Sequence, residues 1–595
     1  MAAMASANDS VASAHLLDRL LVLRESLHAA CVSEQGTVTY AELCTRVEKS
    51  AAALAAYGVD SGTIVAFDAI RSAETIALML AVLHRGAAYL PLDPALPAER
   101  RNQIIEDAKP DLIVDMVENP IVRGTATAPR TGELAYVLFT SGSTGRPKGV
   151  AMRTGSVAAL IDWHVSHPRL GKPARTLQFA PITFDVSFQE IASTFATGGT
   201  LILPTEAQRR DPWALLDLIE RERIERVFMP YVALQSIAEA VASDQRATPA
   251  SLVDVITAGE QLRITPAIRA LFAALPNCTL HNHYGPTETH VVTAHELSGD
   301  SAHWPELPSI GMPLPHAQIR IGEAGSANEG ELYLGGECLA QGYINRPELT
   351  AERFVNVAGQ RWYRTGDNVR RSADGSLDYL GRIDDQIKLA GYRIEPAEIE
   401  TVIGKHAQVA QVVVVAVGEA AEKRLVAHIV PRDSATTPHN EFVQSVRELC
   451  ERWLAAYMVP QEFAIHAMLP LTASGKIDRH RLARAESQVA IEWSEHASLD
   501  QQVSALWKQL LGVAKLDASA NIFDQGARSL TVVQALTELR RRGHVMSVAQ
   551  VYEHPTVAAQ VALLRAPRIV ATTSDEGRGE KQRAALSRFA KTGAR

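Results

Sequence analysis

A loop rich in glycine and hydroxyl side chains offers the clearest chemistry in this sequence. Residues 140–149 read Thr-Ser-Gly-Ser-Thr-Gly-Arg-Pro-Lys-Gly and directly follow a strand-like apolar run at 136–139. Glycines let backbone N–H groups approach an anion, hydroxyl groups add donors, and a lysine adds a positive charge. These groups are suited to holding a triphosphate, although a flexible surface loop is the plain alternative.

This loop is not a Walker A P-loop, in which glycine immediately precedes the lysine and serine or threonine follows it. Here Pro147 precedes Lys148 and Gly149 follows it, so a P-loop kinase or ATPase is disfavoured. The loop instead resembles the phosphate-binding motif of adenylate-forming enzymes, Ser/Thr-Ser-Gly-Ser/Thr-Thr-Gly-x-Pro-Lys-Gly, and it agrees at every fixed position.

Further motifs follow in the order that this family has. They are N-x-Y-G-P-T-E within 282–289, Y-R-T-G-D at 363–367, a hinge block at 381–388 and 391–395, and a lysine block at 469–479. The resemblance extends over about residues 16–482. Within the family, the chain is similar to the adenylation domains of nonribosomal peptide synthetases.

The resemblance implies that the chain converts a carboxylate and ATP into an acyl adenylate, with Mg²⁺ as cofactor. Such a site must neutralise phosphate charge and hold the acid in line with the α-phosphorus. Tyr284 would face adenine, Thr287 the α-phosphate and Asp367 the ribose hydroxyls. The full set of implied nucleotide-binding residues is Thr140, Ser141, Gly142, Ser143, Thr144, Gly145, Tyr284, Thr287, Asp367 and Arg382.

The implied catalytic residues are Lys148, Glu288 and Lys476. Lys148 would neutralise phosphate charge, Glu288 would be the Mg²⁺ carboxylate, and Lys476 would bridge the acid and the phosphate. A solvated loop acid and a surface lysine are the plain alternatives for Glu288 and Lys476. The chain has Ser474 where the family usually has asparagine, and both are small polar turn residues.

Asp384 stands where the family places the hinge between a large and a small domain. The resemblance implies that rotation at this residue withdraws Lys476 and presents another face of the small domain for thioester formation. We therefore expect hinge closure with two productive states.

The acid pocket that the resemblance implies is mainly apolar. Asp185 matches the aspartate that pairs with the α-ammonium group of amino acids, whereas a charged substrate side chain would lack a partner. The ordered pocket set resembles that of proline-activating domains, so we expect L-proline, with pipecolate and valine as alternatives. The set is Asp185, Val186, Gln189, Phe228, Ile256, Ala258, His283, Val291, Val292 and Lys476.

A second motif with its own chemistry lies at 521–530, before a helix-like run. It resembles the 4′-phosphopantetheine attachment site of peptidyl carrier domains, with Ser529 as the implied attachment residue. An ordinary N-cap serine is the plain alternative. Gln525, Ala527 and Arg528 depart from the family pattern, which bears on the transferase that recognises the site.

Alternating strand-like and helix-like runs, such as 200–203 followed by 213–222, predict an α/β fold. With the resemblance, five parts are expected. They are a large adenylation core of layered sheets and helices (15–384), a small mobile α+β C-terminal subdomain (385–484), a linker (485–497), a four-helix-bundle carrier domain (498–565), and a basic, disordered tail or docking segment (566–595).

The bulk properties exclude several classes of function. The chain has 595 residues and a net charge of −8, so general nucleic-acid binding is not expected. Five cysteines without CxxC spacing predict reduced thiols in a cytoplasmic protein, with no zinc site. The N-terminus lacks a signal-peptide pattern, and the apolar runs are too short for a membrane span.

These patterns together predict a ligase that loads an amino acid onto its own carrier domain. Because the resemblance begins near residue 16 and no Gly-x-Ser-x-Gly element follows the carrier, we expect an initiation module. Expected partners are a phosphopantetheinyl transferase and, in trans, a downstream synthetase, a polyketide synthase or a prolyl-carrier dehydrogenase. Dependence on a small activator protein is left open. An acyl-CoA ligase and a non-catalytic carrier scaffold are the alternatives.

Overall fold

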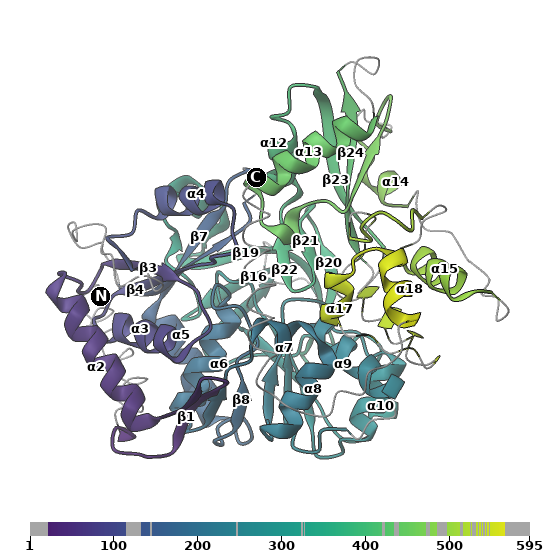
Figure 1. The fold of residues 1–595 in the computed structure, drawn as a ribbon. Helices are drawn as coiled ribbons and strands as arrows, with labels where there is room; N and C mark the ends of the chain where they lie inside the picture. Colours follow the sequence, from purple (N-terminus) through teal and green to yellow (C-terminus); the bar gives the residue numbers. More distant parts are fainter. Residues whose placement is uncertain are drawn as a thin grey trace.

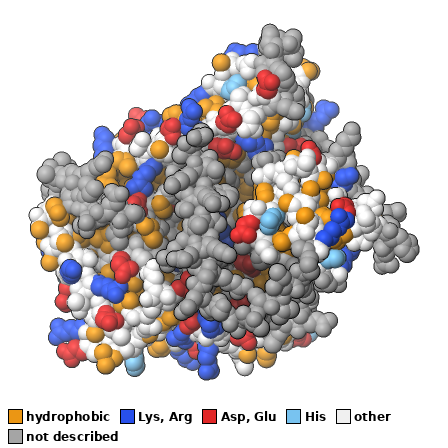
Figure 2. Space-filling view, viewed as in Figure 1, with side chains coloured by type: hydrophobic (Ala, Val, Ile, Leu, Met, Phe, Trp, Pro, Cys, Tyr) orange, Lys and Arg blue, Asp and Glu red, His pale blue; other side chains and the backbone are white. Residues whose placement is uncertain are grey.

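The computed structural model describes a large core, a smaller subdomain above it and a helical unit beside them (Figure 1). The described residues are 22–114, 133–142, 145–244, 248–322, 325, 328–418, 423–432, 439–471, 477–484, 497–511, and 516–565 except 524, 526, 528–530, 533, 534, 537, 540, 541, 543, 545 and 547. Charged side chains of both signs are intermixed on the described part of the face in Figure 2.

The first sheet of the core has six strands in the order β17-β7-β6-β4-β3-β5. They are β3 (Ile64–Asp68), β4 (Ala88–Leu92), β5 (Leu112–Val114), β6 (Leu134–Thr140), β7 (Lys148–Arg153) and β17 (Gly342–Tyr343). Strand β4 pairs in parallel with β3 and β6, whereas β6 and β7 are antiparallel. The glycine-rich loop therefore connects two neighbouring strands of one sheet.

The second sheet has nine strands in the order β14-β13-β12-β11-β10-β8-β9-β1-β2. They are β1 (Ala29–Ser33), β2 (Gly36–Thr39), β8 (Arg175–Leu177), β9 (Thr200–Ile202), β10 (Arg226–Phe228), β11 (Asp254–Thr257), β12 (Thr279–Tyr284), β13 (Thr293–Leu297) and β14 (Met312–Pro313). Strands β8, β10, β11 and β12 are parallel, so their carboxyl ends meet at one edge.

Asp254 on β11 ties three of these strands together inside the protein. Its carboxylate accepts hydrogen bonds from Arg226 of β10, at 3.1 Å, and from Arg169, at 2.6 Å. Its Oδ1 also lies 3.2 Å from Nε2 of His281 on β12. Because Asp254, Arg226 and His281 are all buried, this cluster fixes the register of β10, β11 and β12 from within.

Helices cover the two sheets. They are α2 (Tyr40–Ala56), α3 (Ala73–His84), α4 (Ala98–Ala108), α5 (Thr154–Ser166), α6 (Asp185–Ala196), α7 (Glu206–Arg210), α8 (Pro212–Arg221), α9 (Tyr231–Asp244), α10 (Pro266–Ala273) and the 3-10 helix η1 (Ser301–His303). Local sequence explains several helix starts. A capping box between Thr39 and Glu42 begins α2, and Asp211 caps α8 before Pro212.

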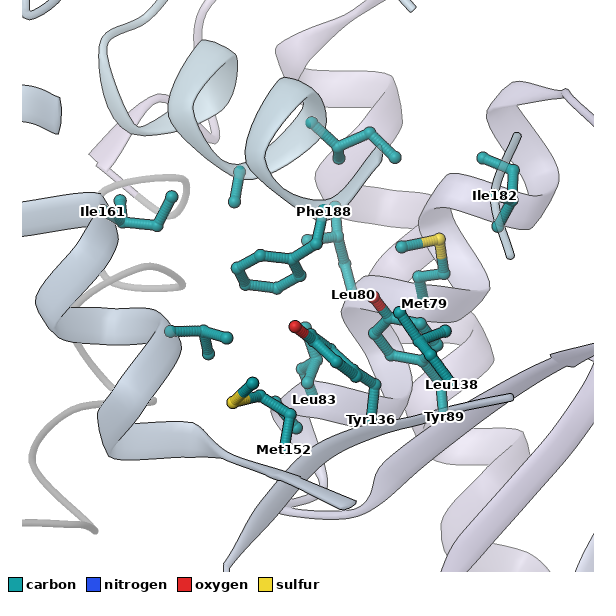
Figure 3. Packing of buried hydrophobic residues seen from close by; sticks show 14 of the residues in the cluster. Met79, Leu80, Leu83, Tyr89, Tyr136, Leu138, Met152, Ile161, Ile182 and Phe188 are labelled. Carbon is teal, nitrogen blue, oxygen red and sulfur yellow. The ribbon is translucent and has the colours of Figure 1, made fainter. Parts of the chain in front are cut away.

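Aromatic and sulfur-containing side chains fill the space between the helices and the first sheet. Tyr136 of β6 lies between Tyr89 of β4 and Phe188 of α6, with ring centroids 5.6 and 5.7 Å away. Met79 of α3 and Met152 of β7 pack in the same cluster (Figure 3). This packing fixes β6, which leads into the glycine-rich loop.

A third sheet completes the core. Its order is β15-β16-β19-β18, and β20 also pairs with β19. The strands are β15 (Ala317–Ile321), β16 (Glu329–Gly336), β18 (Phe354–Val357), β19 (Gln360–Arg371) and β20 (Leu377–Arg382), and α11 (Pro347–Arg353) precedes β18. Strands β19 and β20 carry Asp367 and Arg382 as cross-strand partners.

The smaller subdomain is an α+β unit with its own apolar core. It contains β21 (Ile387–Leu389), β22 (Tyr392–Ile394), α12 (Pro396–Ile403), β23 (Val409–Val417), β24 (Arg424–Pro431), α13 (His439–Trp453), the 3-10 helix η3 (Ala456–Met458), β25 (Glu462–Ile465) and α14 (Arg479–Arg484). Strands β21 and β22 form a separate antiparallel hairpin, called here the β21–β22 hairpin.

The helical unit contains α15 (Leu499–Leu511), α17 (Val548–Glu553) and α18 (Val557–Arg565), and the described residues within 531–539 are helical. Trp507 of α15 donates its indole N–H to Gln560 of α18 at 2.7 Å, and both side chains are fully buried. The rings of Phe523 and Tyr552 stack with centroids 4.6 Å apart. The predicted fold class, an α/β core with a small α+β subdomain followed by a helical domain, is confirmed.

The linker predicted at 485–497 lies outside the described residues except for Ala497, and so does the tail predicted at 566–595. Among the helices that the structure describes, none combines the length and the apolar character needed to cross a bilayer.

Replacing Gln560 by methionine should destabilise the helical unit alone. The side chain keeps a similar length, but the buried indole N–H of Trp507 loses its acceptor, which costs about 1–3 kcal/mol. Hydrogen exchange in the full chain should then accelerate in α15 and α18 and stay unchanged in β6 and β12. Unchanged exchange in α15 would show that the hydrogen bond does not hold the unit together.

Candidate active site

A cavity of about 280 Å³ lies between the large core and the β21–β22 hairpin. It gathers side chains from the carboxyl ends of β6, β10, β11 and β12, from α6 and from β19. The predicted site residues that line it are Thr140, Ser141, Asp185, Val186, Gln189, Phe228, Ile256, Ala258, His283, Tyr284, Thr287, Val291, Asp367 and Arg382. Segments far apart in the sequence thus converge on one chamber.

Other predicted residues lie beside the cavity or elsewhere. Gly142, Gly145, Lys148, Glu288 and Asp384 are placed by the structure but are not part of its lining. Val292 is fully buried in the apolar cluster of the core, where it does not line the cavity. Ser143, Thr144, Lys476 and Ser529 lie outside the described residues.

The glycine-rich loop is held at both ends by the first sheet. Thr140 and Lys148 are cross-strand partners on β6 and β7. A Cβ atom on Gly142 would lie 1.9 Å from the carbonyl oxygen of Arg146, so only glycine fits there. Gly145 has a φ of +79° and donates its N–H to the Gly142 carbonyl at 3.1 Å. Glycine is therefore required for the close turn of this loop.

Glu288 is the most fully enclosed acid near this loop, with none of its surface exposed. Tyr343 donates its hydroxyl to Oε1 at 2.7 Å, and Arg393 of β22 donates to Oε2 at 2.7 Å. Nζ of Lys148 lies 3.5 Å from Oε1. Burial alone would raise the pKa of this carboxyl, but Arg393 and Lys148 hold it well below its usual range.

The charges around Glu288 act on Lys148 in turn. Burial and the neighbouring Arg393 lower the pKa of Lys148 to about 8, against the opposing pull of Glu288. Its ammonium group also lies 5.0 Å from the centre of the Tyr343 ring. The result is a buried cluster of one carboxylate, two cations and a phenol beside the glycine-rich loop.

This cluster fits a Mg²⁺ ion only through Glu288. Magnesium in phosphate-transfer sites uses one or two carboxylates together with water and substrate phosphates. Among the described residues, no group of three or more histidine, cysteine or acidic side chains could hold a metal by itself. Glu288 offers the single carboxylate of this cluster, and in this arrangement its Oε2 is paired with Arg393.

Asp367 forms a second enclosed carboxylate. Its Oδ2 accepts the hydroxyl of Tyr284 at 2.6 Å, and its Oδ1 accepts Nη1 of Arg382 at 3.0 Å. Burial would raise the pKa of this carboxyl, but Lys388 and Arg382 keep it below its usual value. Arg382 also makes a two-pronged ion pair with Asp384, at 2.8 and 2.6 Å, which links this carboxylate to the predicted hinge.

The far end of the cavity is mainly apolar. Asp185 begins α6 and its Oδ1 accepts the backbone N–H of Val186 at 2.8 Å. His283 is buried against Trp163, and burial lowers its pKa well below the ordinary value, so its ring is neutral. Asp185 is the one acidic side chain of the predicted pocket set, and it lines a cavity end that is otherwise mainly apolar.

Two residues of the site were missed by reasoning from sequence. The hinge block contains Arg393, but the resemblance assigns it no role, and Tyr343 carries no signal, since a tyrosine on a two-residue strand fits no motif. The ring of Tyr392, also in the hairpin, packs edge-on against Phe184, with centroids 5.3 Å apart. These contacts join segments more than 50 residues apart, which no local pattern reports.

Comparison with known protein families shows to which family this chain belongs. Residues 23–129 and 118–344 match the AMP-binding enzyme family, 398–476 match the AMP-binding enzyme C-terminal domain, and 501–564 match the phosphopantetheine attachment site. The chain therefore belongs to the AMP-binding enzyme family, an ATP-using and adenylate-forming class for which Mg²⁺ is typical. It also carries a phosphopantetheine attachment domain, so the expected cofactors agree with its family.

Curated relatives include synthases and a tripeptide synthetase. The chain is 32% identical to tyrocidine synthase 2 of Brevibacillus parabrevis over 88% of its own length, but it spans only 15% of that protein. It is 35% identical to phosphinothricin tripeptide synthetase PhsB of Streptomyces viridochromogenes over 87% of its own length and 46% of the relative. The chain thus spans less than half the length of either relative.

Among solved structures, holo-PA1221 is described as a nonribosomal peptide synthetase protein with adenylation and PCP domains, bound to a vinylsulfonamide inhibitor. It matches with a TM-score of 0.77 and 25% identity, over 92% of this chain and 96% of that one. The amide bond synthetase McbA from Marinactinospora thermotolerans matches with a TM-score of 0.67 and 28% identity, over 78% of this chain and 99% of that one.

Replacing Gly142 by alanine should weaken ATP binding without unfolding the core. The added Cβ meets the Arg146 carbonyl, so the loop must open and misplace its donors. Loss of two or three such hydrogen bonds predicts binding of Mg·ATP about ten-fold weaker or more, measured by calorimetry. The control is Gly404→Ala, at the end of α12 with an ordinary φ of −63°, where the nearest atom to an added Cβ is 3.1 Å away. Equal affinities in the two variants would contradict this role of the loop.

Proposed function

We propose that this chain uses ATP to activate an amino acid as an aminoacyl adenylate and then transfers it to phosphopantetheine on its own carrier domain. The observation that carries the proposal is the position of Asp185. Its carboxylate lines a mainly apolar pocket that opens into the same chamber as the residues expected to bind ATP. A carboxylate there suits the α-ammonium group of an amino acid and has no use with a fatty acid.

For the substrate we propose L-proline. The side chains of Val186, Phe228, Ile256, Ala258 and Val291 give the pocket an apolar wall, and Gln189 and His283 add neutral groups. Pipecolate and valine are the alternatives, because one methylene is worth only about 1–3 kcal/mol of discrimination.

For the adenylation step we propose that Lys148, Glu288 and Lys476 are the catalytic residues. When bound, Mg²⁺ would neutralise phosphate charge and orient the triphosphate. Lys148 and the donors of the glycine-rich loop would hold the leaving pyrophosphate, Asp367 the ribose, and Tyr284 the adenine. Lys476 would approach the substrate carboxylate and the α-phosphate, which requires a rotation of the C-terminal subdomain at Asp384.

The described arrangement supports the second of the two hinge states, in which the amino acid is transferred. The β21–β22 hairpin lines the cavity through Gly391, Tyr392 and Arg393. By contrast, Leu469 and Ile477, which flank the segment with Lys476, pack in an apolar cluster that shares no residue with the cavity lining. We also propose the domain boundaries that the motifs predict, at 384, 484, 497 and 565.

We propose that a phosphopantetheinyl transferase modifies Ser529 and that the loaded carrier delivers its amino acid to a synthetase, a polyketide synthase or a prolyl-carrier dehydrogenase in the cytoplasm. The names of the curated relatives, one of which is a tripeptide synthetase, support the first of these receivers. An acyl-CoA ligase is disfavoured by Asp185. A non-catalytic scaffold is disfavoured because the Lys148–Glu288 pair and the separate Asp367–Arg382 pair are both intact.

Amino-acid-dependent ATP–pyrophosphate exchange tests the proposal, with proline, pipecolate, valine and the other standard amino acids as substrates. Asp185→Asn should lower kcat/KM for the amino acid about 100-fold or more, because a buried ammonium loses its partner, and should leave the KM for ATP within about three-fold. The control is Asp60→Asn, whose side chain is 77% exposed and makes, within the described residues, only a 3.7 Å surface ion pair with Arg85 and a local hydrogen bond with the Ser61 N–H, both remote from the cavity lining. Equal losses for both substrates would contradict pairing with the ammonium group.

A separate experiment tests the carrier. Ser529→Ala should keep full ATP–pyrophosphate exchange, since the adenylation residues are unchanged, and should abolish the mass increase that follows incubation with coenzyme A and a phosphopantetheinyl transferase. A normal mass increase in the variant, measured on the intact protein, would place the arm on another residue.

A further inference from the structure

The C-terminal subdomain engages the glycine-rich loop directly. Ser141 donates its hydroxyl to the Arg393 carbonyl at 2.6 Å and accepts the backbone N–H of Glu395 at 3.1 Å. The backbone N–H of Gly142 donates to Oε2 of Glu398 at 2.9 Å. Two groups that the loop would offer to a phosphate are therefore bonded to β22 and the start of α12.

Glu398 brings a negative charge to the loop. Its other oxygen, Oε1, accepts Nη1 of Arg100 on α4 at 2.5 Å, and both side chains are almost fully buried, at 2% and 5% exposure. An anion held by a backbone N–H of a glycine-rich loop and by an arginine has the chemistry of a bound phosphate oxygen. Here the anion is the carboxylate of Glu398, which belongs to the chain itself.

Arg393 brings a matching positive charge to Glu288, the carboxylate proposed to bind Mg²⁺. Its Nη1 lies 2.7 Å from Oε2 of Glu288, inside a cluster whose carboxylate has no exposed surface. A carboxylate buried to this degree needs a positive partner at all times. The guanidinium supplies it in this arrangement, in addition to Lys148 at 3.5 Å.

We propose that Arg393 and Glu398 act as an internal substitute for magnesium pyrophosphate, so that docking of the β21–β22 hairpin and binding of Mg·pyrophosphate at the glycine-rich loop exclude each other. The inference rests on the proposed function and adds to it the order in which pyrophosphate leaves and the hairpin docks. The hairpin docks when magnesium pyrophosphate leaves, because Glu288 then keeps only Lys148 as a cationic partner and the Gly142 N–H has no anionic acceptor. Arg393 is a positioning residue in this scheme.

Competition of this kind is reciprocal. If docking weakens the binding of Mg·pyrophosphate by some factor, Mg·pyrophosphate weakens docking by the same factor. A ligand that binds only the undocked state has an apparent affinity reduced by the fraction of molecules that are undocked. Removing the internal cation should therefore tighten the binding of Mg·pyrophosphate, whereas removing a direct ligand of the phosphate would weaken it.

Calorimetric titration of the full chain with Mg·pyrophosphate separates these cases. Arg393→Met should bind it about three- to ten-fold more tightly than the parent protein, as expected if most parent molecules are docked. The control is Arg370→Met, which removes an arginine paired with Asp378 on the outer part of β19. Weaker binding by Arg393→Met, or affinities equal to those of the parent and the control, would overturn the proposal.

A second variant guards against a folding defect. Glu398→Gln keeps the size of the side chain and an oxygen acceptor for Gly142, but it removes the negative charge. It should also tighten Mg·pyrophosphate binding. In the parent protein, Mg·pyrophosphate should accelerate hydrogen exchange in a peptide covering 387–395, and Mg²⁺ alone or pyrophosphate with a chelator should do so less. Unchanged or slower exchange in that peptide would overturn the proposal.

These measurements need no amino acid, so their failure is distinct from failure of the proposed function. Silent ATP–pyrophosphate exchange with every amino acid, together with tighter binding in Arg393→Met, would reject amino-acid activation alone. Active exchange with proline, together with unchanged Mg·pyrophosphate affinity in Arg393→Met, would reject the internal substitute alone.

Discussion

The arrangement of the site follows from one constraint, the carboxylate of Glu288 with no access to water. An uncompensated charge in such a place would cost several kcal/mol, so positive groups must converge on it. Lys148 comes from the end of the glycine-rich loop, Arg393 from another subdomain, and the Tyr343 hydroxyl from a strand at the edge of the first sheet. The requirement of this one acid for cations thus joins three distant segments of the chain.

The walls of the chamber are also formed by segments that are far apart in the sequence. Parallel strands β10, β11 and β12 end at one edge, and β6 ends at the edge of the neighbouring sheet. Side chains just beyond those ends form the wall of the cavity, as is usual for α/β folds. The C-terminal subdomain covers the opening with a short hairpin, so the chamber belongs to neither part alone.

Reading the sequence anticipated what depends on local pattern and missed what depends on distant contact. The turn of the glycine-rich loop follows from residues within ten positions of each other, and the strand-like run at 200–203 became β9. Tyr343 is invisible to such reasoning, because its role depends on a neighbour 55 residues away. The resemblance placed both Val291 and Val292 in the pocket, whereas Val291 lines the cavity and Val292 is buried in the apolar core beside it, a difference that depends on tertiary packing.

The side chains that hold β10, β11 and β12 together around Asp254 are different from the side chains on these strands that face the chamber. Arg226, Asp254 and His281 lock β10, β11 and β12 together, while Phe228, Ile256 and His283, two residues further along each strand, face the chamber. Substitutions at Phe228 and Ile256 remove none of the hydrogen bonds that Asp254 makes with Arg226 and His281. A protein built in this way can change its preferred molecule over evolutionary time by exchanging a few side chains on an unaltered frame.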